Sequence, residues 1–279
     1  MSTIYKSAAG EQQLRQRYQE ALAAWPVPAE HLRIPTREGE TFVVASGPKE
    51  APPLVLLHGA GANTSMWLGD IATWSRHFRT YAVDLIGEPG LSVPSRPPLA
   101  SDAYAQWLDD VLDGLEIATT AVVATSLGGW MALDHATRRP GRVTRLALLC
   151  PGGVGKQRMG LLFKALLLRP FGRRGMLRSA RSATGLNTPQ AAPVLDQVVL
   201  TFQQFKPRTE QLPVFSDDEL RGLDIPLLLI AGTDDALFDS AGTAQRIQDN
   251  VPNATVRLLP GVGHAIFGQT DEVLAFLRK

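Results

Sequence analysis

Ser126 is the residue whose surroundings point most directly to chemistry. It lies in A-T-S-L-G-G, residues 124–129, directly after the apolar run 121–123. This pattern predicts a strand, a sharp turn and the start of a helix with the serine at the apex, as in the nucleophile elbow G-x-S-x-G. A hydroxyl held there becomes a good nucleophile when a histidine base reaches it. Ala124 replaces the first glycine of the pattern and adds one methyl group.

Two later loops provide the partners that a serine nucleophile needs. The sequences G-T-D-D, ending at Asp235, and G-V-G-H, ending at His264, each follow an apolar run of strand length. A carboxylate orients the histidine, and the histidine takes the serine proton. All three candidates follow predicted strands, whose carboxyl ends are where open α/β sheets place their sites. We expect Ser126, Asp235 and His264 to form a triad, although Asp234 and Asp239 lie in the same loop as Asp235.

A glycine-rich turn could stabilise the negative charge that develops during acyl transfer. H-G-A-G-A, residues 58–62, follows the apolar run 54–57. A backbone N–H aimed at a developing oxyanion is worth about 2.7–4 kcal/mol of barrier. We expect the two donors to be the amides of Ala60 and of Leu127, the residue after the nucleophile. The ring of His58 is interpreted as structural, with only the neighbouring backbone contributing to the hole.

Composition excludes several classes of function. The chain has 279 residues, of which 44% are apolar and 20% charged, and its formal net charge is +1. This balance suits a globular protein and gives no electrostatic reason to expect a nucleic-acid partner. No group of His, Cys and Asp has the spacing of metal ligands, so we expect no metal. Triad chemistry needs no cofactor, and we expect none.

We expect the chain to carry neither an export signal nor a membrane-spanning segment. Its first 25 residues are polar and lack the apolar core of a signal peptide. The longest apolar runs are too short to span a bilayer. The only cysteine, Cys150, cannot form an intrachain disulfide, which suits a reducing compartment. We therefore expect a cytoplasmic protein without stable membrane insertion.

Strands alternate with helices over most of the chain, which predicts an α/β fold with a mostly parallel sheet. The predicted strands are residues 31–35, 41–46, 54–57, 80–86, 121–125, 143–149, 226–231 and 254–259, and the predicted helices are 11–24 (a surface helix), 67–77, 102–115, 130–138, 240–250 and 271–278. The alternation breaks in 153–222, which shows helical patterns and no convincing strand. We interpret 153–222 as a helical cap inserted into a core made of residues 1–152 and 223–279.

The predicted cap is basic in its first part. Lysines and arginines recur from residue 156 to residue 181 with no acidic residue between them, and leucines and phenylalanines alternate with them from 161 to 171. Three interpretations fit this pattern: a lid that faces lipid, a pocket for an anionic substrate, or an amphipathic cover with a solvated basic face. We favour the amphipathic cover.

Four stretches together carry a resemblance to a known family. They are L-L-H-G-A (56–60), R-T-Y-A-V-D-L-I-G (79–87), T-S-L-G-G (125–129) and F-S-D-D-E-L (215–220). The chain resembles the α/β-hydrolases and, more narrowly, bacterial carboxylesterases of the naproxen-esterase type. The order serine, acid, histidine agrees with that family. The resemblance implies the eight-stranded α/β-hydrolase fold, a Ser-His-acid triad and hydrolysis of carboxylic esters. We expect a small-molecule ester as the substrate and a monomer or homodimer.

Two positions depart from the family pattern, and the substrate stays open. Ala124 stands where these enzymes usually have glycine, and aligning G-x-x-D favours Asp235 as the acid over Asp239. A serine nucleophile disfavours haloalkane dehalogenases and epoxide hydrolases of this fold, which use aspartate there. A C–C bond hydrolase, thioesterase, lactonase or perhydrolase would share Ser126. The alternatives of another class are a ligand-binding protein with a retained pocket and little turnover, and a peripheral membrane protein acting through the basic cap.

Overall fold

The computed structural model describes residues 4–158, 160 and 171–279. The strands are β1 (Ala29–Thr36), β2 (Gly39–Ser46), β3 (Pro53–Leu57), β4 (Arg79–Val83), β5 (Thr120–Thr125), β6 (Val143–Leu149), β7 (Leu227–Gly232) and β8 (Ala254–Leu259). The helices are α1 (Ala8–Ala23), η1 (Thr64–Gly69), α2 (Ile71–Trp74), α3 (Ala103–Gly114), α4 (Leu127–Arg138), α6 (Gly172–Thr184), η3 (Pro189–Ala191), α7 (Ala192–Gln204), α8 (Asp217–Arg221), α9 (Ser240–Asn250) and α10 (Thr270–Leu277), η marking 3₁₀ segments.

The strands form one eight-stranded sheet in the order β1-β2-β4-β3-β5-β6-β7-β8. The pairs β1–β2 and β2–β4 are antiparallel, whereas the pairs from β4–β3 through β7–β8 are parallel. The carboxyl ends of β3, β5, β7 and β8 therefore lie along the same edge of the sheet. The α/β fold and the mostly parallel eight-stranded sheet predicted from the sequence are confirmed.

Apolar side chains cover both faces of the sheet. Along β3, Val55 and Leu57 pack against α3 and α4, while Leu54 and Leu56 pack toward η1, α2 and α10. All four side chains are fully buried. A central parallel strand covered by helices on both faces needs a continuous apolar run, and this explains the sequence of β3.

The predicted helix over residues 67–77 is wrong. The structure has a 3₁₀ segment, η1, followed by the short helix α2, with Asp70 between them. Gly69 precedes this break, and glycine disfavours a helix interior. The rings of Trp67 and Trp74 are buried with centroids 5.8 Å apart, so tertiary packing decides the path of this segment.

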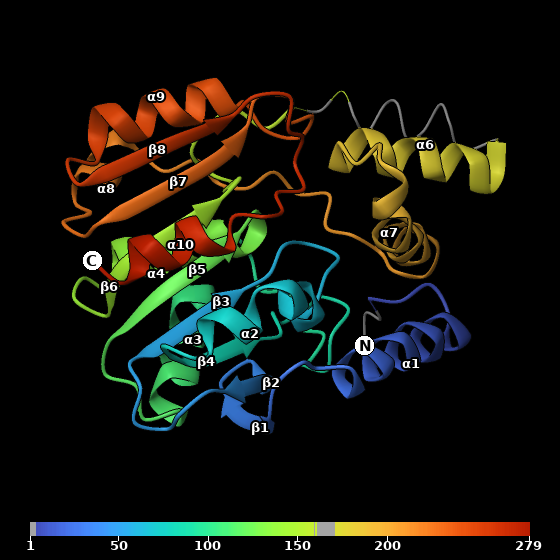
Figure 1. Cartoon of the computed structure of the whole chain (residues 1–279), viewed down its shortest axis with the longest axis horizontal. Coiled ribbons are helices and arrows are strands. Elements are labelled where there is room, and N and C mark those ends of the chain that lie inside the picture. The colour runs from blue at the N-terminus through green and yellow to red at the C-terminus, as the bar shows by residue number, and fades with distance from the viewer. Residues whose placement is uncertain (1–3, 159, 161–170) are drawn as a thin grey trace.

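Helices α6 and α7 lie beside each other away from the sheet, with α1 below them in the view of Figure 1. Helix α1 has one buried face, formed by Gly10, Leu14, Tyr18 and Leu22, so the predicted surface helix is only half exposed. The described part of 153–222 contains helices and no named strand. The division into core and cap stays a prediction, and much of the basic and apolar pattern at 161–170 lies outside the described residues. None of the described helices is long and apolar enough to cross a membrane.

Candidate active site

Ser126 occupies a strained turn between β5 and α4. Its φ is +52° and its ψ −110°, in a region that residues with side chains rarely adopt. The turn is held from both sides, because the Ser126 amide donates to Leu149 O at 3.0 Å and its carbonyl accepts from Trp130 N at 3.0 Å. A Cβ at Gly128 would lie 2.5 Å from two backbone oxygens of β3 and the following loop. This close approach of helix and strand explains why a glycine follows the serine in the motif.

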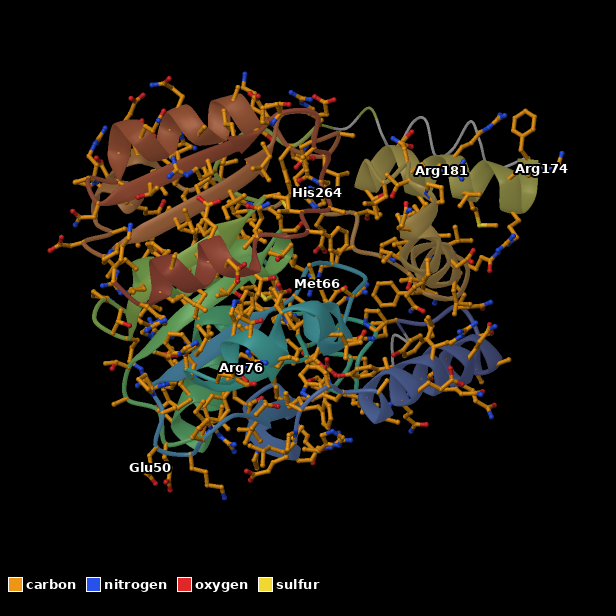
Figure 2. All side chains as sticks on the ribbon, in the orientation of Figure 1. Glu50, Met66, Arg76, Arg174, Arg181 and His264 are labelled. Carbon is orange, nitrogen blue, oxygen red and sulfur yellow. The ribbon has the colours of Figure 1, made fainter. Side chains whose placement is uncertain are left out.

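The structure brings the three predicted triad residues together from three different loops. His264 Nε2 lies 3.0 Å from Ser126 Oγ, and His264 Nδ1 lies 2.7 Å from Asp235 Oδ2. Asp235 is 1% exposed and His264 14% exposed. Figure 2 shows His264 at the edge of the sheet that faces α6, the helix carrying Arg174 and Arg181. The contacts form a continuous path for a proton from the hydroxyl to an imidazole held by a buried carboxylate.

Among the three acids of the loop after β7, Asp235 is the one that contacts the histidine. Its second oxygen accepts the amides of Leu237 and Phe238 at 2.7 and 3.1 Å. Asp239 instead precedes α9 and lies 3.6 Å from Arg158. Asp234 is exposed and accepts from the hydroxyl of the preceding threonine.

The electrostatics of the pair favour the charged state of both partners. Burial raises the pKa of Asp235, but the hydrogen bonds from His264 and from two amides more than offset it and hold that pKa below its usual range. Burial lowers the pKa of His264, but the Cys150 sulfur and the Asp235 carboxylate outweigh burial and raise it above its ordinary value. An imidazolium formed when His264 takes a proton is therefore stabilised where it arises.

The glycine-rich loop after β3 lies directly against the serine. A Cβ built at Gly59 would be 3.4 Å from Ser126 Cβ. Among the described residues, the amides of Ala60 and Leu127 have no hydrogen-bond acceptor in the protein. Leu127 also opens α4, whose amino end favours negative charge. Both predicted oxyanion donors are thus N–H groups without an acceptor in the described part of the chain.

The ring of His58 orients the peptide that carries the Ala60 amide. Its Nε2 accepts the Leu85 amide at 3.0 Å, so the ring proton resides on Nδ1, which donates to Gly59 O at 2.8 Å. Burial lowers the pKa of His58 to about 4, which keeps the ring neutral. Because the carbonyl of Gly59 and the amide of Ala60 belong to one planar trans peptide, fixing the first aims the second the opposite way.

Cys150 is buried, and it contacts His264, the candidate base. Cys150 is 2% exposed, has a φ of +41°, and its Sγ donates to His264 O at 3.1 Å. The same sulfur lies 3.9 Å from His264 Nε2. With Asp235 and His264 it forms a group whose potential ligand atoms lie within 4.8 Å of one another. Residue spacing could not predict this group, because its members follow three different strands.

The end of α6 contacts the loop that carries the histidine. The amide of Ala265 donates to Thr184 O at 2.9 Å. A Cβ at Gly185 would lie 2.5 Å from Gly263 Cα, and Gly185 has a φ of +77°. Two glycines therefore allow the backbone at the end of α6 to reach the His264 loop.

Comparison with known proteins shows that the chain is similar to ester-cleaving enzymes. Residues 54–276 match the alpha/beta hydrolase family. The chain is 35% identical over 268 residues to an uncharacterized carboxylesterase, nap, of Bacillus subtilis, which covers 90% of this chain and 86% of that protein. It is 33% identical to the carboxylesterase YbfK of the same organism, over 97% of this chain and 96% of the relative.

Solved structures agree with the sequence comparison. The crystal structure of naproxen esterase (carboxylesterase NP) from Bacillus subtilis superimposes with a TM-score of 0.85 at 30% identity. The match covers 98% of this chain and 99% of the esterase. The similarity therefore extends over nearly the whole length of both chains.

Proposed function

The chain belongs to the alpha/beta hydrolase family and is an ester-hydrolysing enzyme, and we propose that it cleaves carboxylic esters through Ser126, His264 and Asp235 with an acyl-enzyme intermediate. The observation that carries this proposal is the contact of His264 Nε2 with Ser126 Oγ at 3.0 Å, combined with the 2.7 Å contact to Asp235. The substrate is a small-molecule ester, as the names of the related carboxylesterases suggest.

In the first half of the reaction, Ser126 Oγ attacks the ester carbonyl carbon and its proton passes to His264 Nε2. The carbonyl oxygen becomes an oxyanion, which the amides of Ala60 and Leu127 bind. Collapse of this intermediate breaks the bond to the alcohol, and His264 returns the proton to the leaving oxygen. Asp235 holds the imidazole in the tautomer that this transfer requires.

In the second half, water attacks the acyl-enzyme with His264 as the base. A second tetrahedral intermediate forms at the same amides, and its collapse releases the carboxylic acid and restores Ser126. Deacylation uses the groups that acylation used, so one site performs both halves.

The alternatives that share this triad differ in the bond that is cleaved. Thioesters, lactones and C–C bonds activated by a carbonyl would meet the same serine and the same amides. A protein that binds without turnover would keep the pocket but would leave Ser126 unreactive. We propose that the inserted segment 153–222 acts as a cap and selects among substrates, because α6 contacts the loop that bears His264.

The test is hydrolysis of p-nitrophenyl esters from acetate to laurate by the wild type and by Ser126→Ala. We expect the substitution to lower kcat by roughly 10⁴–10⁶-fold, as removal of a triad nucleophile does. Ser101→Ala changes a half-buried serine whose hydroxyl donates to a loop carbonyl; it is the matched control and should keep full activity. Turnover that survives Ser126→Ala would reject the proposal, and failure of a fluorophosphonate to label the wild type would favour the binding protein.

A further inference from the structure

A buried carboxylate beside the oxyanion loop has no part in the mechanism above. Glu88 follows β4 in the turn G-E-P-G and is 1% exposed. Its Oε2 accepts the backbone amide of Gly61 at 2.6 Å. Gly61 is the residue after Ala60, so the carboxylate holds the peptide next to the one that carries the proposed oxyanion donor.

The loop is thereby held at two successive peptides by two buried side chains. His58 binds the carbonyl of Gly59, and Glu88 binds the amide of Gly61. The Ala60 amide lies between these two anchors. Gly61 has a φ of +69°, a conformation that glycine adopts freely and that does not by itself define the loop. A hydrogen bond from a charged acceptor supplies the missing constraint.

The charge of Glu88 is matched by an arginine from the segment that follows α7. Arg208 is 7% exposed in its side chain, and its Nε lies 4.0 Å from Glu88 Oε1. Its guanidinium also bonds the hydroxyl of Tyr104 and pairs with Glu210. An unpaired carboxylate this close to the hole would repel the oxyanion, so the arginine neutralises it. Glu88 Oε1 and Arg208 Nε are otherwise buried without a hydrogen bond.

Burial works against the ionised form of this carboxylate. It raises the pKa of Glu88 to about 7, against the lowering effects of the Gly61 amide, Arg96 and Arg208. Burying an ionisable carboxyl group costs free energy, so packing alone does not explain why a carboxyl group occupies this position. The amide that it holds provides that reason.

We propose that Glu88 is a positioning residue for the oxyanion hole, acting through the Gly61 amide to hold the Ala60 N–H in line with the developing oxyanion. This inference rests on the proposed function, because it assumes attack by Ser126. It also links the proposed cap, which contains Arg208, to the site. The effect is confined to the transition state, since a ground-state ester carries no negative charge at that oxygen.

The test compares two neutral replacements of similar length. Glu88→Gln keeps an oxygen that accepts the Gly61 amide, whereas Glu88→Met removes it. We expect E88M to lower kcat for p-nitrophenyl esters by roughly 10–100-fold with little change in KM, as for a misplaced transition-state donor. We expect E88Q to retain most of the wild-type kcat. The difference between the two variants isolates the acceptor from the charge.

A trifluoromethyl ketone provides a readout that a merely structural role would not move. Ser126 Oγ adds to its carbonyl carbon, the serine proton passes to His264, no group leaves, and the resulting oxyanion occupies the hole. We expect the inhibition constant of this ketone to rise in E88M by the same factor by which kcat/KM falls. In E88Q both quantities should stay near the wild-type values.

The controls keep folding and chemistry apart. Glu210→Gln makes the same chemical change in another carboxylate that pairs with Arg208, is 65% exposed, and should change neither quantity. Rates are divided by the number of sites that a fluorophosphonate labels, so an unfolded fraction does not count. If E88M does not fold, Glu88→Asp replaces it, since it keeps the charge but is one methylene too short to reach Gly61.

Each outcome decides the inference. An unchanged kcat and inhibition constant in E88M or E88D would overturn it, and so would an equal loss in E88Q and E88M. A loss of kcat without weaker ketone binding would point to general structural damage and would also overturn it. Because Ser126→Ala is measured beside these variants, residual turnover there reports failure of the proposed function instead.

Discussion

On one side of Ser126, formed by the loops after β7 and β8, the chemistry lies in side chains. Asp235 and His264 contact each other at 2.7 Å, and His264 reaches the serine at 3.0 Å. On the other side, formed by the loops after β3 and β4, the proposed donors are backbone amides, and buried side chains such as His58 and Glu88 only aim them. The proposed chemistry of the first side depends on which side chains are present. That of the second side depends on the direction in which backbone N–H groups point.

The charges on the two sides also differ. Hydrogen bonds outweigh burial at Asp235, so its pKa lies below the usual range. Burial dominates at Asp84, whose pKa is raised to about 6 although Tyr18 and two amides donate to it. Each carboxylate accepts three hydrogen bonds, but only Asp235 accepts one from an imidazole that can take up a positive charge, His264. The contact with His264 therefore separates the proposed catalytic acid from an acid that holds a loop.

Replacing Asp235, the partner of His264, should have the largest effect on kcat. We expect Asp235→Asn to lower kcat by roughly 10⁴-fold, because the amide cannot stabilise the imidazolium and favours the wrong tautomer. Asp239→Asn is the matched control in the same loop and should stay near wild-type activity, since Asp239 pairs only with Arg158 among the charged side chains described. Steady-state kinetics on the best p-nitrophenyl ester measure both. Equal losses in the two variants would contradict the assignment of the acid.

Breaking the support of the backbone donor should have a smaller effect. In His58→Phe the Gly59 carbonyl and the Leu85 amide lose their partner, and the Ala60 amide is no longer aimed. We expect kcat to fall by at least about 10-fold, toward the roughly 10²–10³-fold limit for loss of one oxyanion donor. His135→Phe removes another fully buried histidine, bonded to Asp109 on α3, and should lower thermal stability without lowering kcat per labelled site. A wild-type kcat in folded His58→Phe would show that the ring does not orient the hole.

The smallest effect on activity is expected from Cys150, which only shifts the pKa of His264. Cys150 raises the pKa of His264, so Cys150→Ala should lower that pKa. His264 accepts the serine proton only when neutral, and activity is lost as pH falls through its pKa. The acid limb of kcat/KM should therefore move to lower pH, with the plateau at higher pH unchanged. Cys150→Ser keeps a donor to the His264 carbonyl, so it separates support of the loop from the effect of the sulfur on the pKa of His264. An acid limb at the wild-type pH in Cys150→Ala would show that Cys150 does not raise that pKa.

Much of the fold follows from the sequence because its signals are local. The apolar runs of β3 and β5 and the hairpin β1–β2 lie where patterning predicts them. The region between β3 and β4 does not, since two buried tryptophans and the break at Asp70 decide its shape. Helix α1 shows the same limit, because its apolar face packs partly against α7, which begins at Ala192, and partly against the core around η1.

The sequence alone determined which residues have reactive groups and that each follows a strand. The motifs around the serine, the histidine and the acid are local patterns. Parallel strands bring such patterns to one edge of the sheet, whatever their separation in the chain. Only the tertiary structure decided that Asp235, and not Asp239, meets His264, that a cysteine lies beside the base, and that Glu88 holds Gly61. These are contacts between loops from different strands, and their distances depend on backbone direction and packing, which no local pattern encodes.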